Sequence, residues 1–323
     1  MKKTKMELIM ENLLFSMGAT MPIFLMMILG AFLRKQGIID EEFAAKINRF
    51  VFLVPLPALV FNDLRGEDFR RVFDLPFFLF CLAVTILCIL IAIGLSLFLK
   101  ERGLRGEFIQ ASYRSSAALI GMAFLQSLYG KTTAAAVMII ASVPLYNVVA
   151  VIVLCLLKPG EGKIDKKRLR ETLVGVIKNP IIIAIAIGIL WSFFRISMPP
   201  VLEKSVESVS NLATPLGLMA MGASFTYSAL DKEKVPVLCA TFLKLIGFAA
   251  LFLPVAIGFG FRAEKLVTIL VMLGSATTVT SYIMAKNLGN QGSLTAGAVT
   301  LTTFLSPFTL TAWLFLLRTL RLV

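Results

Sequence analysis

Long apolar runs alternate with short polar breaks along the whole chain. Each run has roughly the 20 residues that a helix needs to cross the hydrocarbon core of a bilayer. The runs lack the strict alternation of apolar and polar positions that a membrane-spanning strand needs, so helices are expected. The pattern predicts an all-α membrane protein with ten transmembrane helices, near residues 12–33, 44–64, 75–99, 107–129, 133–157, 178–195, 205–229, 235–260, 264–287 and 293–317.

The composition agrees with a lipid environment. Hydrophobic residues make up 58% of the 323 positions and charged residues 16%, with a mean hydropathy of +0.88, which is more apolar than a soluble core requires. The net charge of +13 comes from Lys and Arg at the ends of apolar runs, which indicates membrane anchoring and no nucleic acid partner. Neither a disulfide, a metal site nor a cofactor is expected, because the chain has no His and its four cysteines fall inside apolar runs: Cys81, Cys88, Cys155 and Cys239.

A basic stretch at 158–171 separates two sets of five spans, and residues 166–177 are predicted to form an amphipathic interfacial helix. Because cytoplasmic loops carry an excess of Lys and Arg, this stretch is placed in the cytoplasm and both termini outside it, although the N-terminal lysines favour the opposite orientation. The run at 12–33 is interpreted as an uncleaved first span, since it is too long for a signal peptide. The short loops indicate a multi-pass protein of a prokaryotic cell membrane.

The two halves resemble each other at a nearly constant offset of 158 to 162 residues, as expected after a duplication. A bundle in which Pro and Gly recur at helix ends is the alternative. The matching landmarks are Pro22 and Gly30 with Pro180 and Gly188, PLPALVF from Pro55 with PLGLMAM from Pro215, Leu75-Pro76 with Val235-Pro236, and GKTTAAAV from Gly130 with GSLTAGAV from Gly292.

The odd number of spans in each half means that the second half crosses the membrane in the opposite direction to the first. Such inverted repeats are typical of secondary transporters, whose sites lie at the membrane midplane between the repeats. The predicted organisation is therefore a first five-helix repeat at 1–157, a cytoplasmic basic linker at 158–177 and a second, inverted five-helix repeat at 178–323.

The fourth and ninth spans are the least hydrophobic and are equivalent in the two halves. Residues 110–130 read QASYRSSAALIGMAFLQSLYG, and residues 271–289 read VMLGSATTVTSYIMAKNLG. Both place Ser, Thr and Gly at mid-depth, where hydroxyl groups and loosened backbone coordinate ligands. Close helix packing through small residues is the alternative interpretation.

Two cations are predicted inside the membrane, Arg114 in the fourth span and Lys244 in the eighth, with no Asp or Glu at comparable depth. This arrangement favours an anionic ligand. The alternatives are that Arg114 extends to the cytoplasmic surface and that Lys244 binds a backbone carbonyl. Without a buried carboxylate or a His, the usual proton relays are not expected.

Several carboxamides also lie at depth in the predicted spans. Asn179 before Pro180 is interpreted as a helix start. For Asn48 and Asn211, which begin equivalent spans, helix capping is favoured over a place in a pocket.

Four segments resemble the auxin efflux carrier family, which includes the plant PIN proteins and bacterial carriers of malonate or malate. They are RSSAALIGMAFLQSLYG from Arg114, NPIIIAIAIGILW from Asn179, TPLGLMAMGASF from Thr214 and SATTVTSYIMAKNLG from Ser275, and the order of spans extends the resemblance over essentially the whole chain. The resemblance implies a ten-helix carrier with a scaffold of spans 1, 2, 6 and 7 and a transport domain of the others. It also implies that spans 4 and 9 are broken and cross near the substrate carboxylate, as in the bile-acid symporter type of fold.

The chain departs from the family pattern at the expected site. Where bacterial members resemble R-x-N followed by G-x-P, Arg114 and Gly121 match, whereas Ser116 replaces Asn and Ala123 replaces Pro. In the ninth span, Ala276 stands where the family has a proline.

The leading hypothesis is a secondary carrier that exports a small carboxylate or dicarboxylate by alternating access. A sodium-coupled anion symporter and a membrane sensor that binds a ligand without moving it are the alternatives, while an enzyme is not expected. The expected partners are the organic anion and the lipid bilayer, with a homodimer left open. The candidate substrate-binding residues are Arg114, Ser115, Ser116, Gly121, Ala276, Thr277, Thr278 and Ser281.

Overall fold

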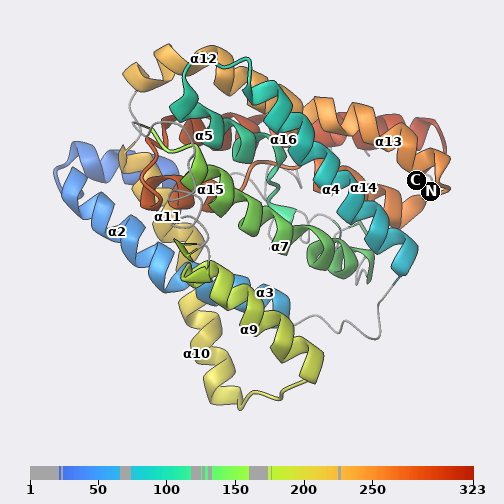
Figure 1. Ribbon diagram of the computed structural model, residues 1–323, viewed down its shortest axis with the longest axis horizontal. Coiled ribbons are helices and arrows are strands. Elements are labelled where there is room, and N and C mark those ends of the chain that lie inside the picture. The colour runs from blue at the N-terminus through green and yellow to red at the C-terminus, as the bar shows by residue number, and fades with distance from the viewer. Residues whose placement is uncertain are drawn as a thin grey trace, which may run out of the picture.

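All regular elements in the described part of the chain are helices, as the apolar pattern predicts (Figure 1). The computed structural model describes residues 22, 25–65, 74–117, 125, 128–129, 133–159, 174–175, 177–224 and 227–323. In the N-terminal half, a first helix that ends at residue 35 is followed by α2 (Glu41–Leu53), α3 (Pro55–Arg65), α4 (Leu75–Ser96), α5 (Arg102–Tyr113) and α7 (Thr133–Leu156). In the C-terminal half lie α9 (Pro180–Phe194), α10 (Pro200–Asn211), α11 (Ala213–Ser224), α12 (Tyr227–Phe242), the π-helical turn η2 (Leu243–Gly247), α13 (Phe248–Gly258), α14 (Ala263–Gly274), α15 (Thr280–Asn287) and α16 (Ser293–Thr319).

Helix boundaries follow from local chemistry. Asp74 begins α4 by accepting a hydrogen bond from the Phe77 N–H group at 3.1 Å, which satisfies one of the unpaired donors of the first turn. Asn179 begins α9 in the same way, with its side chain accepting from the Ile181 N–H group at 2.9 Å, as predicted. The break between α2 and α3 falls at the residue before Pro55, where the proline ring disfavours the helical conformation.

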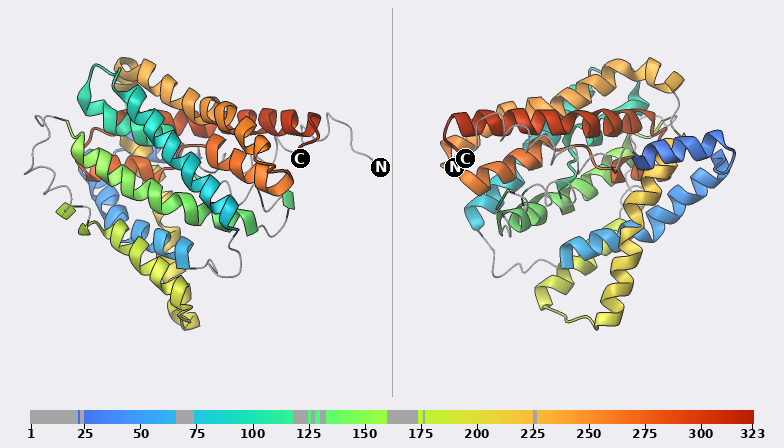
Figure 2. Two further views of the ribbon diagram at one scale, coloured as in Figure 1. Left: turned by 45° about the vertical axis from the view of Figure 1, so that its right-hand side comes forward. Right: turned by 180° about the vertical axis from the view of Figure 1, so that it is seen from behind.

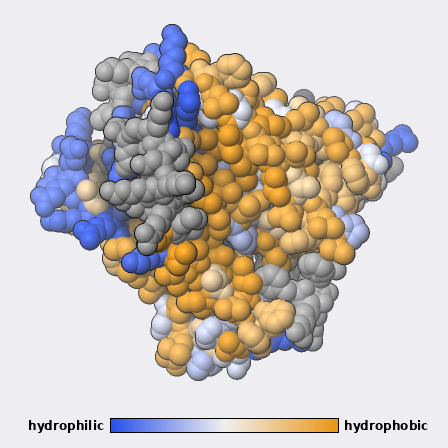
Figure 3. Space-filling model, viewed as in Figure 1, coloured by the Kyte–Doolittle hydropathy of each residue, from blue (hydrophilic) through white to orange (hydrophobic). Residues whose placement is uncertain are grey.

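Five helical segments in the described residues are long and apolar enough to cross a membrane: 41–65, 75–96, 134–156, 233–258 and 293–319. Their outer faces carry exposed apolar side chains, and Figure 3 shows an almost continuous hydrophobic surface over much of one side of the molecule. Such an extended apolar surface is expected where lipid, and not water, surrounds the protein. The total number of crossings stays a prediction.

The helices form two packing groups. In the lower group of Figure 1, α3 packs against α9 and α10, and α2 packs against α11. In the upper group, α4 packs against α5 and α7, α12 against α16, and α13 against α14. Contacts of α15 with α2 and α11, and of α7 with α9, join the two groups, which Figure 2 shows from two further directions.

Within the lower group, the first helix and α11 approach each other very closely. A Cβ atom added at Gly30 would lie 2.1 Å from the backbone oxygen of Met219, and one added at Gly222 would lie 2.0 Å from that of Met27. No larger residue fits at either position unless the backbone moves. Small residues at such contacts are characteristic of helix packing in membranes, where van der Waals contact replaces the hydrophobic effect.

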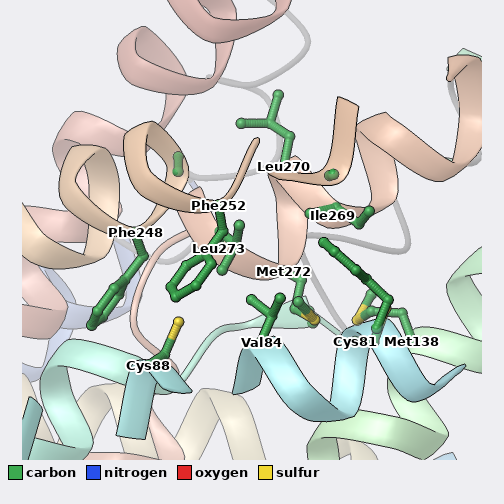
Figure 4. Close-up of a cluster of buried hydrophobic side chains, with 14 of the residues drawn as sticks. Cys81, Val84, Cys88, Met138, Phe248, Phe252, Ile269, Leu270, Met272 and Leu273 are labelled. Carbon is green, nitrogen blue, oxygen red and sulfur yellow. The ribbon is translucent and has the colours of Figure 1, made fainter. Parts of the chain in front are cut away.

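An apolar core lies between α4, α13 and α14 in the upper group. Figure 4 shows Cys81 and Cys88 of α4 in this cluster, opposite Phe252 and Met272. Both cysteine side chains are buried and pack as small apolar groups. This core supports α14, which leads into the site described next.

Candidate functional site

Helices α5 and α14 each end in an extended segment, here called an interruption, and the two interruptions touch. After α5, Arg114 adopts an extended conformation (φ −70°, ψ 133°), and after α14, Ser275 does the same (φ −77°, ψ 163°). The chain resumes its helical path at α15 in the second case. The Ser116 N–H group donates a hydrogen bond of 2.8 Å to the Ala276 carbonyl oxygen, so the two breaks cross at this point. Ala276 therefore lies at an interruption that forms without the proline of the family pattern.

Two serines pair at the crossing. Ser115 Oγ and Ser275 Oγ are hydrogen-bonded, and Ser115 Oγ also donates to the Val271 carbonyl oxygen at 3.3 Å. That carbonyl belongs to the last turn of α14, where backbone oxygens have few partners within the helix. The serines therefore hold the crossing together as well as placing hydroxyl groups beside it.

Thr277 also forms hydrogen bonds that hold the crossing together. Its Oγ1 donates to the Ala111 carbonyl oxygen at 2.8 Å, and its N–H group donates to Thr302 Oγ1 at 3.0 Å. Nearby, Gln110 Nε2 donates to the Ser281 carbonyl oxygen at 2.9 Å. These three bonds connect α5, α15 and α16 to the interruptions and give them a fixed geometry.

The Arg114 side chain at the first interruption is buried, with 2% of its surface exposed. Nη2 donates to Asn147 Oδ1 and to Thr280 Oγ1, both at 2.9 Å, while Nη1 contacts Met284 Sδ at 2.9 Å and Gln110 Oε1 at 3.4 Å. All of these acceptors are neutral. The alternative in which the side chain extends to the membrane surface is therefore wrong.

A narrow cavity of about 50 Å³ opens beside the guanidinium group, which is room for a few water molecules or one end of a small ligand. Its wall combines polar groups of the upper packing group with one helix, α3, of the lower group. The lining residues are Leu59, Val60, Asp63, Arg114, Ser115, Ser116, Val143, Tyr146, Asn147, Thr278 and Thr280.

Four of the candidate residues, Arg114, Ser115, Ser116 and Thr278, line this cavity. The other candidates are placed differently. Ala276, Thr277 and Ser281 are buried around the crossing and are not among the lining residues. Gly121 lies outside the described residues, as does Ala123.

Sequence reasoning missed the lining residues Asp63, Tyr146, Asn147 and Thr280. Asp63 contradicts the expectation that no carboxylate lies at depth, although its position inside the predicted span 44–64 was a signal that could have revealed it. Asn147 lies inside the predicted span 133–157 but was given no role. Its pairing with Arg114, 33 residues away, depends on how α7 packs against α5.

A second carboxylate, Glu107 in α5, also contradicts that expectation, because it is completely buried. Its two oxygens accept hydrogen bonds from the Gly292 N–H group at 2.7 Å and from the N–H and Oγ1 groups of Thr295 at 3.1 and 3.0 Å. These donors belong to the beginning of α16, where unpaired N–H groups favour a negative charge. Glu107 therefore has a structural role.

The alternative interpretation of Lys244, that it binds a backbone carbonyl, is confirmed. It is completely buried in η2, and its Nζ donates to the carbonyl oxygens of Met272 at 3.2 Å and Leu273 at 2.9 Å. Both carbonyls belong to the last turn of α14. The ammonium group therefore caps the helix that ends at the second interruption, where a cation is electrostatically favourable.

The capping roles predicted for two carboxamides are wrong. Asn48 lies in the middle of α2, and Asn211 is the last residue of α10. The side-chain oxygen and nitrogen of the buried Asn48 form no hydrogen bond within the described residues. The apolar pattern misplaced these residues because it did not reveal where the spans 44–64 and 205–229 each divide into two helices.

The fold and the site together define a class: an all-helical, membrane-embedded protein with two interrupted helices that cross beside a buried cation. Comparison with known families specifies this further, because the model of a family described as membrane transport protein matches residues 15–314. The chain belongs to this family, the auxin efflux carrier family that its sequence resembles, and it is a membrane transport protein.

Curated relatives agree with this membership. The chain is 23% identical to "Uncharacterized transporter YfdV" of Escherichia coli K12, over 95% of this chain and 99% of that protein. It is 25% identical to "Uncharacterized transporter MJ1031" of Methanocaldococcus jannaschii, over 66% of this chain and 70% of the relative. It is 21% identical to the "Putative malonate transporter" of Rhizobium meliloti, over 93% and 95% of the two chains. These relatives are named as transporters, which agrees with the expectation that the chain is not an enzyme.

Proposed function

We propose that the protein is a secondary carrier that moves a small organic anion, such as a carboxylate, across the cell membrane by alternating access. The observation that carries this proposal is the buried guanidinium of Arg114. It faces a cavity and its hydrogen-bond acceptors are all neutral. Its Nε atom also has no hydrogen-bond partner within the described residues. A buried cation with a donor to spare favours an anionic ligand.

The composition of the cavity wall supports alternating access. Leu59, Val60 and Asp63 come from α3 in the lower packing group, whereas the other lining residues come from the interruptions, α7 and α15. A movement of one group against the other would therefore open and close this cavity. The lower group consists of the helices that the family resemblance assigns to the scaffold.

Three pairs of contacts support the proposed inverted repeat. Ser115 and Ser275 are 160 residues apart, close to the offset of the repeat, and contact each other, as expected for positions on a two-fold axis between halves. Glu107 of α5 binds the beginning of α16, and Glu264 of α14 accepts a hydrogen bond of 3.1 Å from the Ala134 N–H group near the beginning of α7. The first helix, in span 1, contacts α11, in span 7, and α3, in span 2, contacts α9, in span 6. Each of these two spans of the first half thus packs against the counterpart of the other, as a two-fold axis between the halves predicts.

The direction of transport follows from charge. In a cell with a negative interior, an anion gains about 2.3 kcal/mol per 100 mV when it leaves, so export needs no coupling ion. The proposal retains the repeats at 1–157 and 178–323, the cytoplasmic linker at 158–177, and both termini outside the cytoplasm.

The test is counterflow of labelled malonate, malate and lactate into sealed liposomes that contain the purified protein. The assay includes an imposed potential, the variant Arg114→Gln, and the exposed lysine variant Lys204→Met as a control. We expect accumulation of at least one anion that responds to the potential, is lost with Arg114→Gln and persists with Lys204→Met. Binding of these anions without movement would contradict the carrier and support a sensor, and neither binding nor movement would contradict the anion class.

A further inference from the structure

A large groove lies between α4, α5 and α12, separate from the cavity beside Arg114. Its volume is about 920 Å³, which is within the range of cavities that bury a whole ligand. Figure 1 shows α12 passing beside the turn that joins α4 to α5. The groove and the cavity share no lining residue, so the groove is not part of the proposed anion site.

The walls of the groove are apolar and open toward the surroundings of the protein. Apart from Lys100 and Glu101, every lining residue is apolar. Phe98 is 84% exposed and Phe242 is 57% exposed, so these rings have little contact with the rest of the protein. Both α4 and the segment 233–258 are long and apolar enough to cross a membrane. A groove between two such helices faces lipid, and an acyl chain matches its apolar walls.

The two charged residues of the groove lie together at one place. Lys100 and Glu101 occupy the turn between α4 and α5, and the apolar lining residues continue from there along both helices. Both side chains are exposed, and neither forms a hydrogen bond or an ion pair within the described part of the chain. The apolar groove therefore begins at an adjacent cation and carboxylate.

Neighbouring contacts fix this turn and place it at one edge of the membrane. The Arg105 guanidinium donates to the Leu97 carbonyl oxygen at 3.1 Å and to that of Leu99 at 2.9 Å, which satisfies carbonyls at the end of α4. A Cβ atom added at Gly103 would lie 3.0 Å from Pro159 Cβ, so the beginning of α5 adjoins the beginning of the basic linker. In the proposed orientation, this is the cytoplasmic edge.

An adjacent cation and carboxylate complement a headgroup that carries both charges. The Lys100 ammonium can donate to a phosphate, and the Glu101 carboxylate can accept from a primary ammonium. Glu233, whose Oε1 accepts from Ser293 Oγ at 2.7 Å, adds negative potential near Glu101. Phosphatidylethanolamine carries both groups. Phosphatidylcholine has no N–H donor on its nitrogen, and phosphatidylglycerol has no positive group to face the carboxylate.

We propose that this groove binds one molecule of phosphatidylethanolamine, with an acyl chain along the apolar walls, the phosphate at Lys100 and the ammonium at Glu101. This site goes beyond the proposed anion transport, because it uses neither Arg114 nor the interruptions. The bound lipid contacts α4, α5 and α12 together. Because it binds the folded protein at a site that these three helices form, it stabilises the folded state.

Native mass spectrometry of the full-length protein tests the headgroup preference. The protein is purified, freed of lipid and mixed with equal amounts of phosphatidylethanolamine, phosphatidylcholine and phosphatidylglycerol that have identical acyl chains but distinguishable masses. We expect the protein to retain phosphatidylethanolamine at least about threefold more than either of the others, since an exposed pair of charges contributes a factor of about this size.

Two variants separate the headgroup from the acyl chain. Glu101→Lys should shift the preference to phosphatidylglycerol, because two cations then face the headgroup. Leu238→Trp, at an exposed position of α12, should reduce retention of all three lipids by about the same factor, because the larger ring fills the groove. Glu207→Lys on α10 is the matched control for the charge reversal, since Glu207 is exposed outside the groove, and it should keep the wild-type preference.

Equal retention of the three lipids by the wild type, a wild-type preference for phosphatidylglycerol, or retention of none would overturn the proposal. An unchanged preference in Glu101→Lys would overturn the role of the carboxylate, and unchanged retention in Leu238→Trp would overturn the placement in this groove. Anion counterflow should continue in Glu101→Lys. A wild type that selects phosphatidylethanolamine but moves no anion would contradict the proposed function alone and support the lipid site.

Discussion

The two interruptions of this protein each have a buried cation nearby, but the two cations face different partners. At the first interruption, the Arg114 guanidinium turns toward a cavity and binds the side chains of Asn147 and Thr280. At the second, the Lys244 ammonium turns toward the backbone and binds the last carbonyls of α14. Both residues were predicted from the sequence as intramembrane charges that favour an anion.

The difference follows from the chemistry of the two side chains. An ammonium is a compact donor that fits the unpaired carbonyls at the end of a helix, where the helix dipole is negative. A guanidinium offers five donors in a plane, so neutral neighbours can orient it while donors remain for a carboxylate. A charge inside a membrane thus indicates function only when its surroundings leave part of it available.

The largest effect is expected from Arg114→Gln, which removes the charge that faces the cavity. Transport should fall by roughly 100-fold or more, as expected for the loss of hydrogen bonds between a charged donor and a carboxylate. The thermal midpoint should stay within a few degrees of the wild type, because the Gln amide can still donate to neighbouring acceptors such as Asn147 and Thr280. Counterflow and thermal unfolding of the same preparation test both statements, and equal transport by wild type and variant would contradict the role of Arg114.

The second effect is expected from Lys244→Met, which removes the ammonium that caps α14. The carbonyls of Met272 and Leu273 lose their donor, and we expect a loss of about 1 to 3 kcal/mol of stability. Anion affinity, measured on the folded protein, should change less than about threefold. Thermal unfolding in detergent and binding of the labelled anion that counterflow identifies measure the two quantities, with the exposed Lys204→Met as control. A large loss of affinity at unchanged stability would contradict the capping role of Lys244 and indicate that it binds the anion.

A smaller effect is expected at the hydrogen bond between Ser115 and Ser275, which joins the two interruptions. Each single Ala variant should lose about 1 kcal/mol of stability, as for an ordinary buried hydrogen bond. The double variant should lose less than the sum, because both substitutions remove the same contact. A double-mutant cycle by thermal unfolding measures this coupling, and strictly additive losses would show that the pair does not hold the crossing together.

The smallest effect is expected from Asp74→Asn, at the start of α4. The hydrogen bond from Lys265 of α14 lowers the pKa of the Asp74 carboxyl, despite the opposing effect of partial burial. A lowered pKa means that the pair contributes stability at neutral pH and loses it as the pH falls through the folded-state value, below the usual range. The variant should therefore differ from wild type by less than about 1 kcal/mol at pH 7 and converge with it as the pH falls below the lowered pKa of Asp74. Thermal unfolding across this range measures the convergence, and a constant difference would contradict it.

Much of the helix layout was predictable from the sequence, because the apolar runs record where chain meets lipid. The predicted span 75–99 corresponds to α4, and the predicted span 293–317 corresponds to α16. The interruptions in the fourth and ninth spans also agree with the family resemblance. At Ala276 the break forms without a proline. There, the Ser116 N–H group donates a hydrogen bond to the Ala276 carbonyl oxygen.

The contacts of the site were less predictable, because they depend on how distant helices pack. No periodicity indicates that Thr277 binds the Ala111 carbonyl and is missing from the cavity, or that Asn147 orients Arg114. The carboxylates were misjudged because hydropathy averages hide single charges. The Glu107 carboxylate accepts a hydrogen bond from the Gly292 N–H group at the beginning of α16, 185 residues further along the chain.

The most direct test is equilibrium binding of the labelled anion that counterflow identifies to the purified protein and to the variants Arg114→Gln and Lys244→Met, each confirmed as folded. We expect binding to be lost in Arg114→Gln and to stay within about threefold of wild type in Lys244→Met. Equal binding by wild type and Arg114→Gln, or loss only in Lys244→Met, would contradict the placement of the anion beside the first interruption.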